Sequence, residues 1–207
     1  SDTQVALRIK STTTANMTDG FGVTQLFSVQ DSSGSNFNIA QLRVVRDGAD
    51  DSGAFVFAPY TTGTAIERAR IDSSGNLLVG KTSSSTGVVG ARFSANGFSN
   101  ITRDGGECFN LNRLTSDGTI IDFRKDSATV GSIGTSATDL FIGTGVAGLR
   151  FREAGSQLMP WNTTTNAAND SAIDIGKSDA KFKDLHLSGT ANVGAINITG
   201  SGTSTFG

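Results

Sequence analysis

Residues 46–82 read RDGADDSGAFVFAPYTTGTAIERARIDSSGNLLVGKT, and this stretch decides the fold class. Its centre, AFVFA at 54–58, is apolar at every position, which predicts a central β-strand covered on both faces. Turn signals bound this segment, with Asp47-Gly48 before it and Ser73-Ser74-Gly75 after it. Because Asp-Gly pairs supply the positive φ angles of tight hairpins, we expect antiparallel strands joined by short turns.

The same strand-and-turn pattern continues along the chain. Apolar residues alternate with polar ones at 5–9, 21–29, 121–123, 149–151 and 185–187, and each run predicts a half-buried strand. Further turn signals are Asp-Gly at 19, 104 and 117 and Ser-Ser-Gly at 32. Helical periodicity is almost absent, and one short helical turn is expected at 178–182, capped by Ser178. The predicted fold class is therefore all-β with almost no helix.

The composition predicts that this chain shares its core with other chains. Hydrophobic residues make up 36% of the sequence, and there are 26 glycines. Thirteen Phe residues argue against disorder, and their strand-like spacing predicts axial or sheet–sheet core layers. The final stretch, GTANVGAINITGSGTSTFG at 189–207, cannot bury itself and would leave open strand edges. We expect an elongated homotrimer of small β-domains with an intertwined shaft, either a β-prism or a triple β-helix.

Three regions are predicted. Residues 1–82 should form a compact β-domain, and residues 83–155 a second β-region with shorter strands. Residues 156–207 should form a loop followed by the intertwined trimeric shaft segment. Because the sequence starts at Ser1 and ends within a repetitive pattern, we expect an ordered fragment of a longer polypeptide.

Charge and residue usage disfavour several classes of function. The net charge is −2, and the 17 basic residues are interspersed with 19 acidic ones, so nucleic acid is not an expected partner. No apolar run reaches the length of a membrane span, so membrane insertion is not expected. Cys108 and His186 are the single residues of their types, which nearly excludes a structural zinc site. We expect no cofactor and assign no catalytic or metal-binding residue.

Catalytic and phosphate-binding patterns are weak. The three glutamates, Glu67, Glu107 and Glu153, and the many turn-located aspartates do not define the carboxylate pair of a glycosidase. A Ser-His-Asp triad would need His186, which is better interpreted as a surface or inter-chain residue on the polar face of a strand. The GKT sequence at 80–82 lacks the rest of a phosphate-binding loop.

Two binding sites remain as hypotheses. The DGADDSG segment at 47–53 brings together three aspartates whose oxygens are candidate Ca²⁺ ligands, but its spacing favours a hairpin tip. Tyr60 and Trp161 are expected in loops, APYTTG and MPWNTT, and are the candidate glycan contacts. The alternative is that each ring fills a junction between regions.

Three stretches together resemble a known class of proteins. Residues 46–82 and RLTSDGTIIDFRKDSATVGSIG at 113–134 resemble modules of bacteriophage tail fibre and tail spike proteins, especially of marine and cyanobacterial phages. AIDIGKSDAKFKDLHLSGTANVGAINITG at 172–200 resembles the stretch that often precedes an endosialidase-type intramolecular chaperone domain. The resemblance implies a homotrimer on the virion, in the phage tail. Its partners would be copies of itself, other phage tail proteins and a host surface glycan.

The expected function is structural: a trimeric spacer and host-adsorption fibre, and not an enzyme. One alternative is a tail spike depolymerase domain acting on bacterial surface polysaccharide, which would need a carboxylate-lined groove. Another is a trimeric bacterial surface adhesin, whose stalks usually carry the heptad repeats that this sequence lacks.

Overall fold

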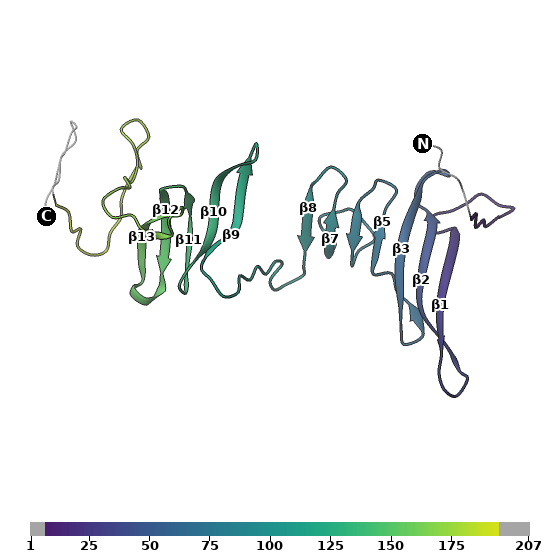
Figure 1. Ribbon diagram of the computed structural model, residues 1–207. Coiled ribbons are helices and arrows are strands. Elements are labelled where there is room, and N and C mark those ends of the chain that lie inside the picture. The colour runs from purple at the N-terminus through teal and green to yellow at the C-terminus, as the bar shows by residue number, and fades with distance from the viewer. Residues whose placement is uncertain (1–6, 195–207) are drawn as a thin grey trace. The chain divides into compact units, whose positions relative to one another are not determined.

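The chain divides into two compact units, Ser1–Asn110 and Leu111–Gly207, and the computed structural model describes residues 7–194 (Figure 1). Unit 1 is built on one antiparallel sheet, in which the strand order is β1-β2-β3-β5-β6-β7-β8 and β4 pairs with β3. Its strands are β1 (Gly22–Gln30), β2 (Asn36–Arg46), β3 (Gly53–Thr61), β4 (Thr64–Ala65), β5 (Ala69–Ile71), β6 (Leu77–Val79), β7 (Gly90–Phe93) and β8 (Ser99–Thr102).

Unit 2 is built on a second antiparallel sheet, in which the strands lie in the order β14-β13-β12-β11-β10-β9. Among the described residues, the helical structure is limited to one short 3-10 turn, η1. The elements are β9 (Gly118–Lys125), β10 (Ala128–Ser136), β11 (Asp139–Thr144), β12 (Ala147–Arg152), η1 (Glu153–Gly155), β13 (Gln157–Asn162) and β14 (Ala167–Ala168). The all-β prediction is confirmed.

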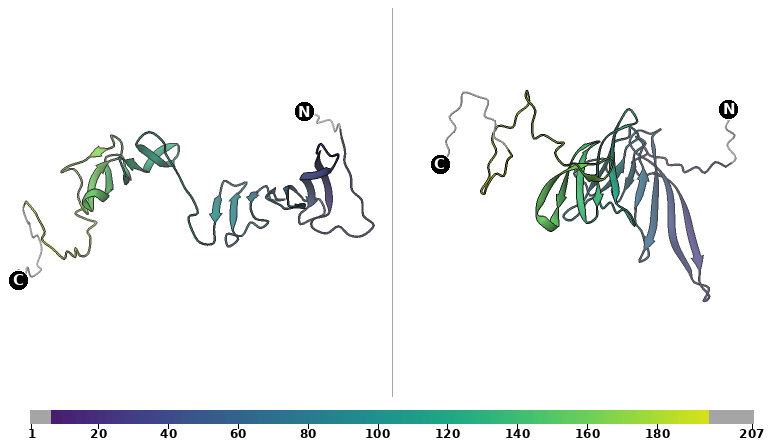
Figure 2. Two further views of the ribbon diagram at one scale, coloured as in Figure 1. Left: turned by 90° about the horizontal axis from the view of Figure 1, so that it is seen from below. Right: turned by 60° about the vertical axis from the view of Figure 1, so that its left-hand side comes forward.

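Each sheet is a single layer. Within each unit, strands contact their hydrogen-bonded neighbours, and the described residues of that unit form no second layer against its sheet (Figures 1 and 2). Only the side chains of a single-layer sheet can shield its two faces from water, so apolar residues that they do not shield stay exposed.

Aspartate side chains build the hairpin tips of unit 1. In the β1–β2 turn, Asp31 Oδ1 accepts the backbone N–H groups of Ser33 and Ser35, at 2.8 and 2.9 Å. The β5–β6 turn repeats this geometry, with Asp72 Oδ1 accepting from the N–H groups of Ser74 and Asn76. These side-chain bonds add to the backbone hydrogen bonds that close each turn, and the turn predictions at 32 and 73 are confirmed.

The neighbouring hairpins β5–β6 and β7–β8 repeat one sequence pattern. Residues 69–79 read ARIDSSGNLLV and residues 91–101 read ARFSANGFSNI, so Ala-Arg at the start and Gly in the turn recur. β6 pairs with β7, which joins the two copies edge to edge in one sheet. Strand pairing therefore continues across residues 82/83, the expected border between the first two regions. The β12–β13 pair likewise spans residues 155/156, the expected border between the second and third regions.

Several local predictions are wrong. Residues 54–58 lie in the sheet interior, but Phe55 and Phe57 are 49% and 47% exposed, so one face of β3 is open in the single chain. Residues 178–182 contain no helix: Lys177 and Ala180 form a two-residue reverse turn closed by two backbone hydrogen bonds.

Two of the predicted strands also fail. No strand forms at 185–187, where Leu185 is 80% exposed. The predicted strand at 5–9 lies partly outside the described residues, and residues 7–9 are not in a strand. The predicted shaft segment likewise lies outside the described residues from 195 onward.

Candidate assembly surfaces

One face of the unit 1 sheet is apolar and open. Cross-strand partners share a face, and the register places Phe55 opposite Val44 and Ile71, and then Leu77 opposite Phe93. Large side chains on this face are between 37% and 49% exposed. We call this set the unit 1 apolar face: Phe27, Val44, Phe55, Phe57, Ile71, Leu77, Val79, Phe93 and Ile101.

The opposite face of the same sheet is covered by its own long polar side chains. Ala54, Val56, Ala58 and Leu78 point to this side and are at most 1% exposed. The register places an arginine on either side of Val56, from β2 and from β5. Since the stems of long charged side chains shield these apolar residues, the face is closed over β3 and β6 without a second layer, whereas Leu26 of β1 is 48% exposed on it.

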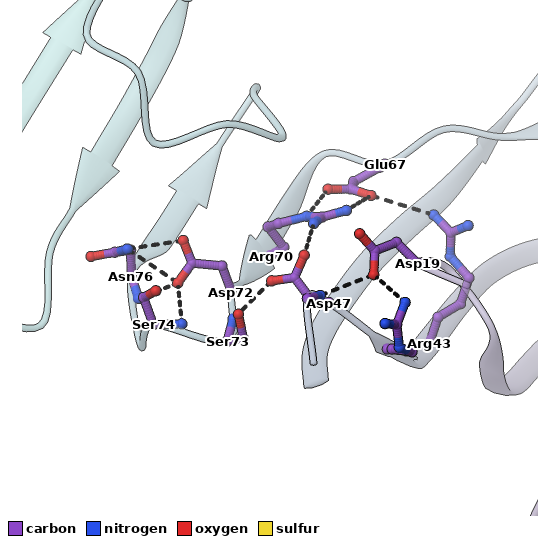
Figure 3. A network of polar contacts seen from close by, with 11 residues as sticks. Asp19, Arg43, Asp47, Glu67, Arg70, Asp72, Ser73, Ser74 and Asn76 are labelled. Carbon is purple, nitrogen blue, oxygen red and sulfur yellow. Dashed lines mark hydrogen bonds and ion pairs between the residues drawn. The ribbon is translucent and has the colours of Figure 1, made fainter. Parts of the chain in front are cut away.

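A charged network holds these arginines in place (Figure 3). Arg70 Nε donates to Glu67 Oε1 at 2.6 Å, and Arg70 Nη2 donates to Glu67 Oε2 at 3.0 Å, a bidentate pair. Arg70 Nη1 lies 3.4 Å from Asp47 Oδ1, and Arg43 Nη2 lies 3.7 Å from Glu67 Oε2. The network thus ties β2, β5 and the β2–β3 turn together.

Two of the three aspartates of the DGADDSG segment, Asp47 and Asp50, are engaged within this hairpin tip. Asp47 Oδ2 accepts the backbone N–H of Ser73 at 2.9 Å, and this bond, with the charge of Arg70, lowers the pKa of Asp47. Asp50 Oδ1 accepts from Arg46 Nε at 2.9 Å. The carboxylates therefore face arginines and backbone amides rather than one another, and no group of three or more metal-ligating side chains gathers in residues 7–194.

Unit 2 has the same two-sided design. Its register aligns Leu140 with Phe151 and Leu158 on one face, and large side chains there are 39% to 59% exposed. We call this set the unit 2 apolar face: Phe123, Leu140, Ile142, Leu149, Phe151 and Leu158.

The other face of unit 2 is closed by an aromatic and charged cluster. Arg150 lies over the Trp161 ring, 4.7 Å from its centroid, and pairs with Asp139 at 2.7 Å. The backbone N–H of Glu153 donates to Asp139 at 3.1 Å; this bond, and then Arg150, lower the pKa of the carboxyl group. Phe141 is fully buried in this face, where it covers Gly134.

Both candidate glycan residues lie in strands, so the prediction that they occupy loops is wrong. Tyr60 is near the end of β3, and its hydroxyl accepts from Gln41 Nε2 at 2.9 Å. Trp161 is in β13, is 4% exposed, and donates from Nε1 to Asn166 Oδ1 at 3.2 Å. With Arg150 over its ring, Trp161 has little surface left for stacking, and the glycan contact stays a prediction for both residues.

The remaining candidates from the sequence do not come together. His186 is exposed and lies outside any strand, which corrects its predicted place on a strand face. Glu67 belongs to the charged network, whereas Glu107 and Glu153 are exposed elsewhere. Cys108 is exposed.

The sequence reasoning missed the sidedness of the sheets. A signal for it exists, because the arginines of the closed faces stand between apolar neighbours in Ala69-Arg70-Ile71, Ala91-Arg92-Phe93 and Leu149-Arg150-Phe151. Strand alternation sends each arginine to one face and its neighbours to the other.

No helix in residues 7–194 is long and apolar enough to cross a membrane. No family model, curated protein or solved structure matches the chain.

Proposed function

We propose that this chain is a structural segment of a bacteriophage tail fibre, in which three copies bury their apolar faces against one another. The observation that carries the proposal is the pair of open apolar faces on single-layer sheets. Large exposed apolar patches on soluble proteins mark interaction sites.

The area of the unit 1 apolar face fits a stable interface. With about 150–250 Å² per aromatic side chain, and somewhat less per aliphatic one, its half-exposed residues offer roughly 700 Å² of apolar surface. A standard interface buries about 800 Å² per partner. One face of one unit therefore approaches the area that a specific complex needs.

The chemistry of the face favours another copy of the same chain. Charged side chains gather on the closed face, while the apolar face is uncharged along the centres of its strands. An uncharged surface can meet identical copies of itself around a symmetry axis without like-charge repulsion. The recurrence of this design in unit 2 supports one packing rule for the whole chain.

The assignment to a phage tail is supported by the three sequence stretches that resemble tail fibre and tail spike modules. In this role the chain is a spacer on the virion that joins other tail proteins and helps present a host-adsorption element. It acts through stiffness and threefold display, not through chemistry on a substrate.

Gel electrophoresis in dodecyl sulfate tests the shared core. Without heating, the purified chain should migrate as a trimer, since the apolar faces buried between the chains resist the detergent. After boiling it should migrate at the 21.4 kDa of one chain. Migration as a single chain in both lanes would overturn the proposal. Immunogold labelling of tailed virions that carry this sequence would test its location.

A further inference from the structure

We infer that unit 1 carries a binding pocket for an uncharged sugar residue between the tips of its two repeated hairpins. The pocket is a hollow of 440 Å³ formed by the β5–β6 and β7–β8 turns. It is lined by Ser74, Asn76, Arg92, Ser94, Ala95, Asn96 and Phe98. Ligand pockets for small molecules fall in about this range of volume.

The two hairpin tips are built against each other. A Cβ placed on Gly75 would lie 3.3 Å from the Cβ of Ala95, so the turns touch. Gly75 and Gly97 both have positive φ, at 78° and 86°, which sets the tight turns that expose the polar residues around them. The hollow is therefore a consequence of repeating one hairpin in one sheet.

The amide groups that line the hollow are oriented by their turns. Asn96 Oδ1 accepts the N–H of Phe98 at 3.1 Å, which leaves its Nδ2 group as a donor. Asn76 Nδ2 donates to both carboxylate oxygens of Asp72, at 3.1 and 2.9 Å, which leaves its Oδ1 as an acceptor. The hydroxyl groups of Ser74 and Ser94 make no hydrogen bond among the described residues.

An aromatic ring stands beside these polar groups. Phe98 is 50% exposed, and the guanidinium of Arg92 lies 4.9 Å from its ring centroid. Arg92 fixes the ring, and Phe98 keeps exposed surface on which the C–H face of a sugar can pack. Hydroxyl, amide and aromatic groups together match a ligand that has hydroxyls on its rim and an apolar face.

The charges favour an uncharged ligand over a phosphate or a carboxylate. Arg92 is the one charged residue that lines the hollow, and its Nη1 already donates to the carbonyl oxygen of Ser84. Asp72 lies directly behind Asn76 and would repel an anion. The ligand class is therefore a neutral hexose, either free or as one unit of a glycan.

The pocket lies away from the proposed interface. Arg92 is on the closed face of the sheet, while its neighbours Ala91 and Phe93 are on the unit 1 apolar face. The biological role of the pocket rests on the proposed function, since three copies would display three pockets and gain avidity for a surface glycan.

Saturation-transfer NMR on the full chain tests the pocket with methyl α-glucoside, methyl α-mannoside and methyl β-galactoside as separate probes. We expect transfer to the ring protons of at least one probe, with a dissociation constant of millimolar order. Phe98→Leu should weaken this binding roughly threefold to tenfold because the ring is lost. Asn96→Asp keeps the oxygen that caps the turn and removes the donor, and it should weaken binding about tenfold.

Phe109→Leu is the matched control, because Phe109 is 66% exposed and lies outside the strands and the pocket. The inference is overturned if no probe receives transfer, if both pocket variants bind as the control does, or if inorganic phosphate binds more tightly than every glycoside. The mass of each sample in solution is measured in parallel. If the sample has the mass of a single chain and still binds sugar, the trimer proposal is overturned and the pocket inference stands. If the sample is a trimer that binds no sugar, the pocket inference is overturned and the trimer proposal stands.

Discussion

Replacement of Phe57 by threonine tests whether the unit 1 apolar face is an interface. Phe57 is 47% exposed in the single chain and lines a shallow hollow of 300 Å³ with Phe27, Leu42 and Pro59. Threonine is a good strand residue, so the change removes apolar surface with little effect on the strand itself. If the face were open to solvent, the substitution would change only the stability of the single chain, in which the ring is half-buried, and would have no effect on association.

If the exposed part of the Phe57 ring is buried in a trimer, the substitution weakens association of the three copies. About 90 Å² of a phenylalanine of about 200 Å² remains exposed at this position. At about 25 cal/mol per Å² this is ~2.3 kcal/mol for each copy, or ~7 kcal/mol for three. The association constant should therefore fall about 10⁵-fold. Because trimer dissociation depends on the square of the concentration, the midpoint should rise roughly 300-fold.

A dilution series followed by sedimentation velocity or mass photometry measures this midpoint. Phe109→Thr is the control, since Phe109 is more exposed, at 66%, and belongs to neither apolar face. We expect the control to dissociate at the wild-type concentration. A Phe57→Thr midpoint within about twofold of wild type would refute the reasoning, because that residue would then gain no cover from another copy.

Three further predictions concern the closed faces. Gly134→Ala should destabilise unit 2 by about 1–3 kcal/mol in thermal unfolding, because the new Cβ would lie 2.5 Å from Phe141 Cζ. The control is Gly189→Ala, which has nothing within 4 Å of its new Cβ and should leave the thermal midpoint unchanged. Because the pKa of Asp139 is lowered in the folded chain, its carboxylate stabilises the fold at pH values above the unfolded pKa of about 3.9. Trp161 fluorescence should therefore report loss of structure as the pH falls below that value, and no change between pH 5 and 8. A transition centred above pH 5 would contradict this prediction. Glu67→Gln removes the negative charge that Arg43 and Arg70 share, and it should lower the urea midpoint by an amount equivalent to about 1–2 kcal/mol. The effect should be smaller in high salt. An unchanged midpoint would show that the network adds nothing to the stability of unit 1.

Several of the strands and hairpin turns were predictable because their signals are local. Alternation at 21–29, 121–123 and 149–151 identified β1, β9 and β12, and the aspartates at 47 and 72 lie in hairpin tips as their turn chemistry requires. The turn at Asp126 and Ser127 escaped notice, since both residues adopt positive φ without a glycine.

Which face of each sheet is shielded from solvent was not predictable from hydrophobicity alone. Residues 54–58 look buried on both sides because every residue is apolar, yet Val56 lies between two arginines while Phe55 and Phe57 are left open. A long charged side chain covers apolar surface as effectively as a second layer does, and strand periodicity does not reveal it.

The stretch MPWNTT predicts a loop at Trp161 because it combines proline with typical turn residues. Pro160 is nevertheless accommodated in β13 opposite Leu149, beside the two-residue strand β14 near the sheet edge. An aromatic ring with a polar group makes Tyr60 and Trp161 candidate glycan contacts, but these properties do not distinguish a ring buried under Arg150 from an exposed one.

The most direct test of the shared core is the native mass of the purified chain at low micromolar concentration, measured by sedimentation equilibrium or native mass spectrometry. If three copies bury their apolar faces together, the particle should have three times the 21.4 kDa mass of one chain. A well-folded particle of 21.4 kDa under the same conditions would contradict this account, since the apolar faces of both sheets would then be stable in water.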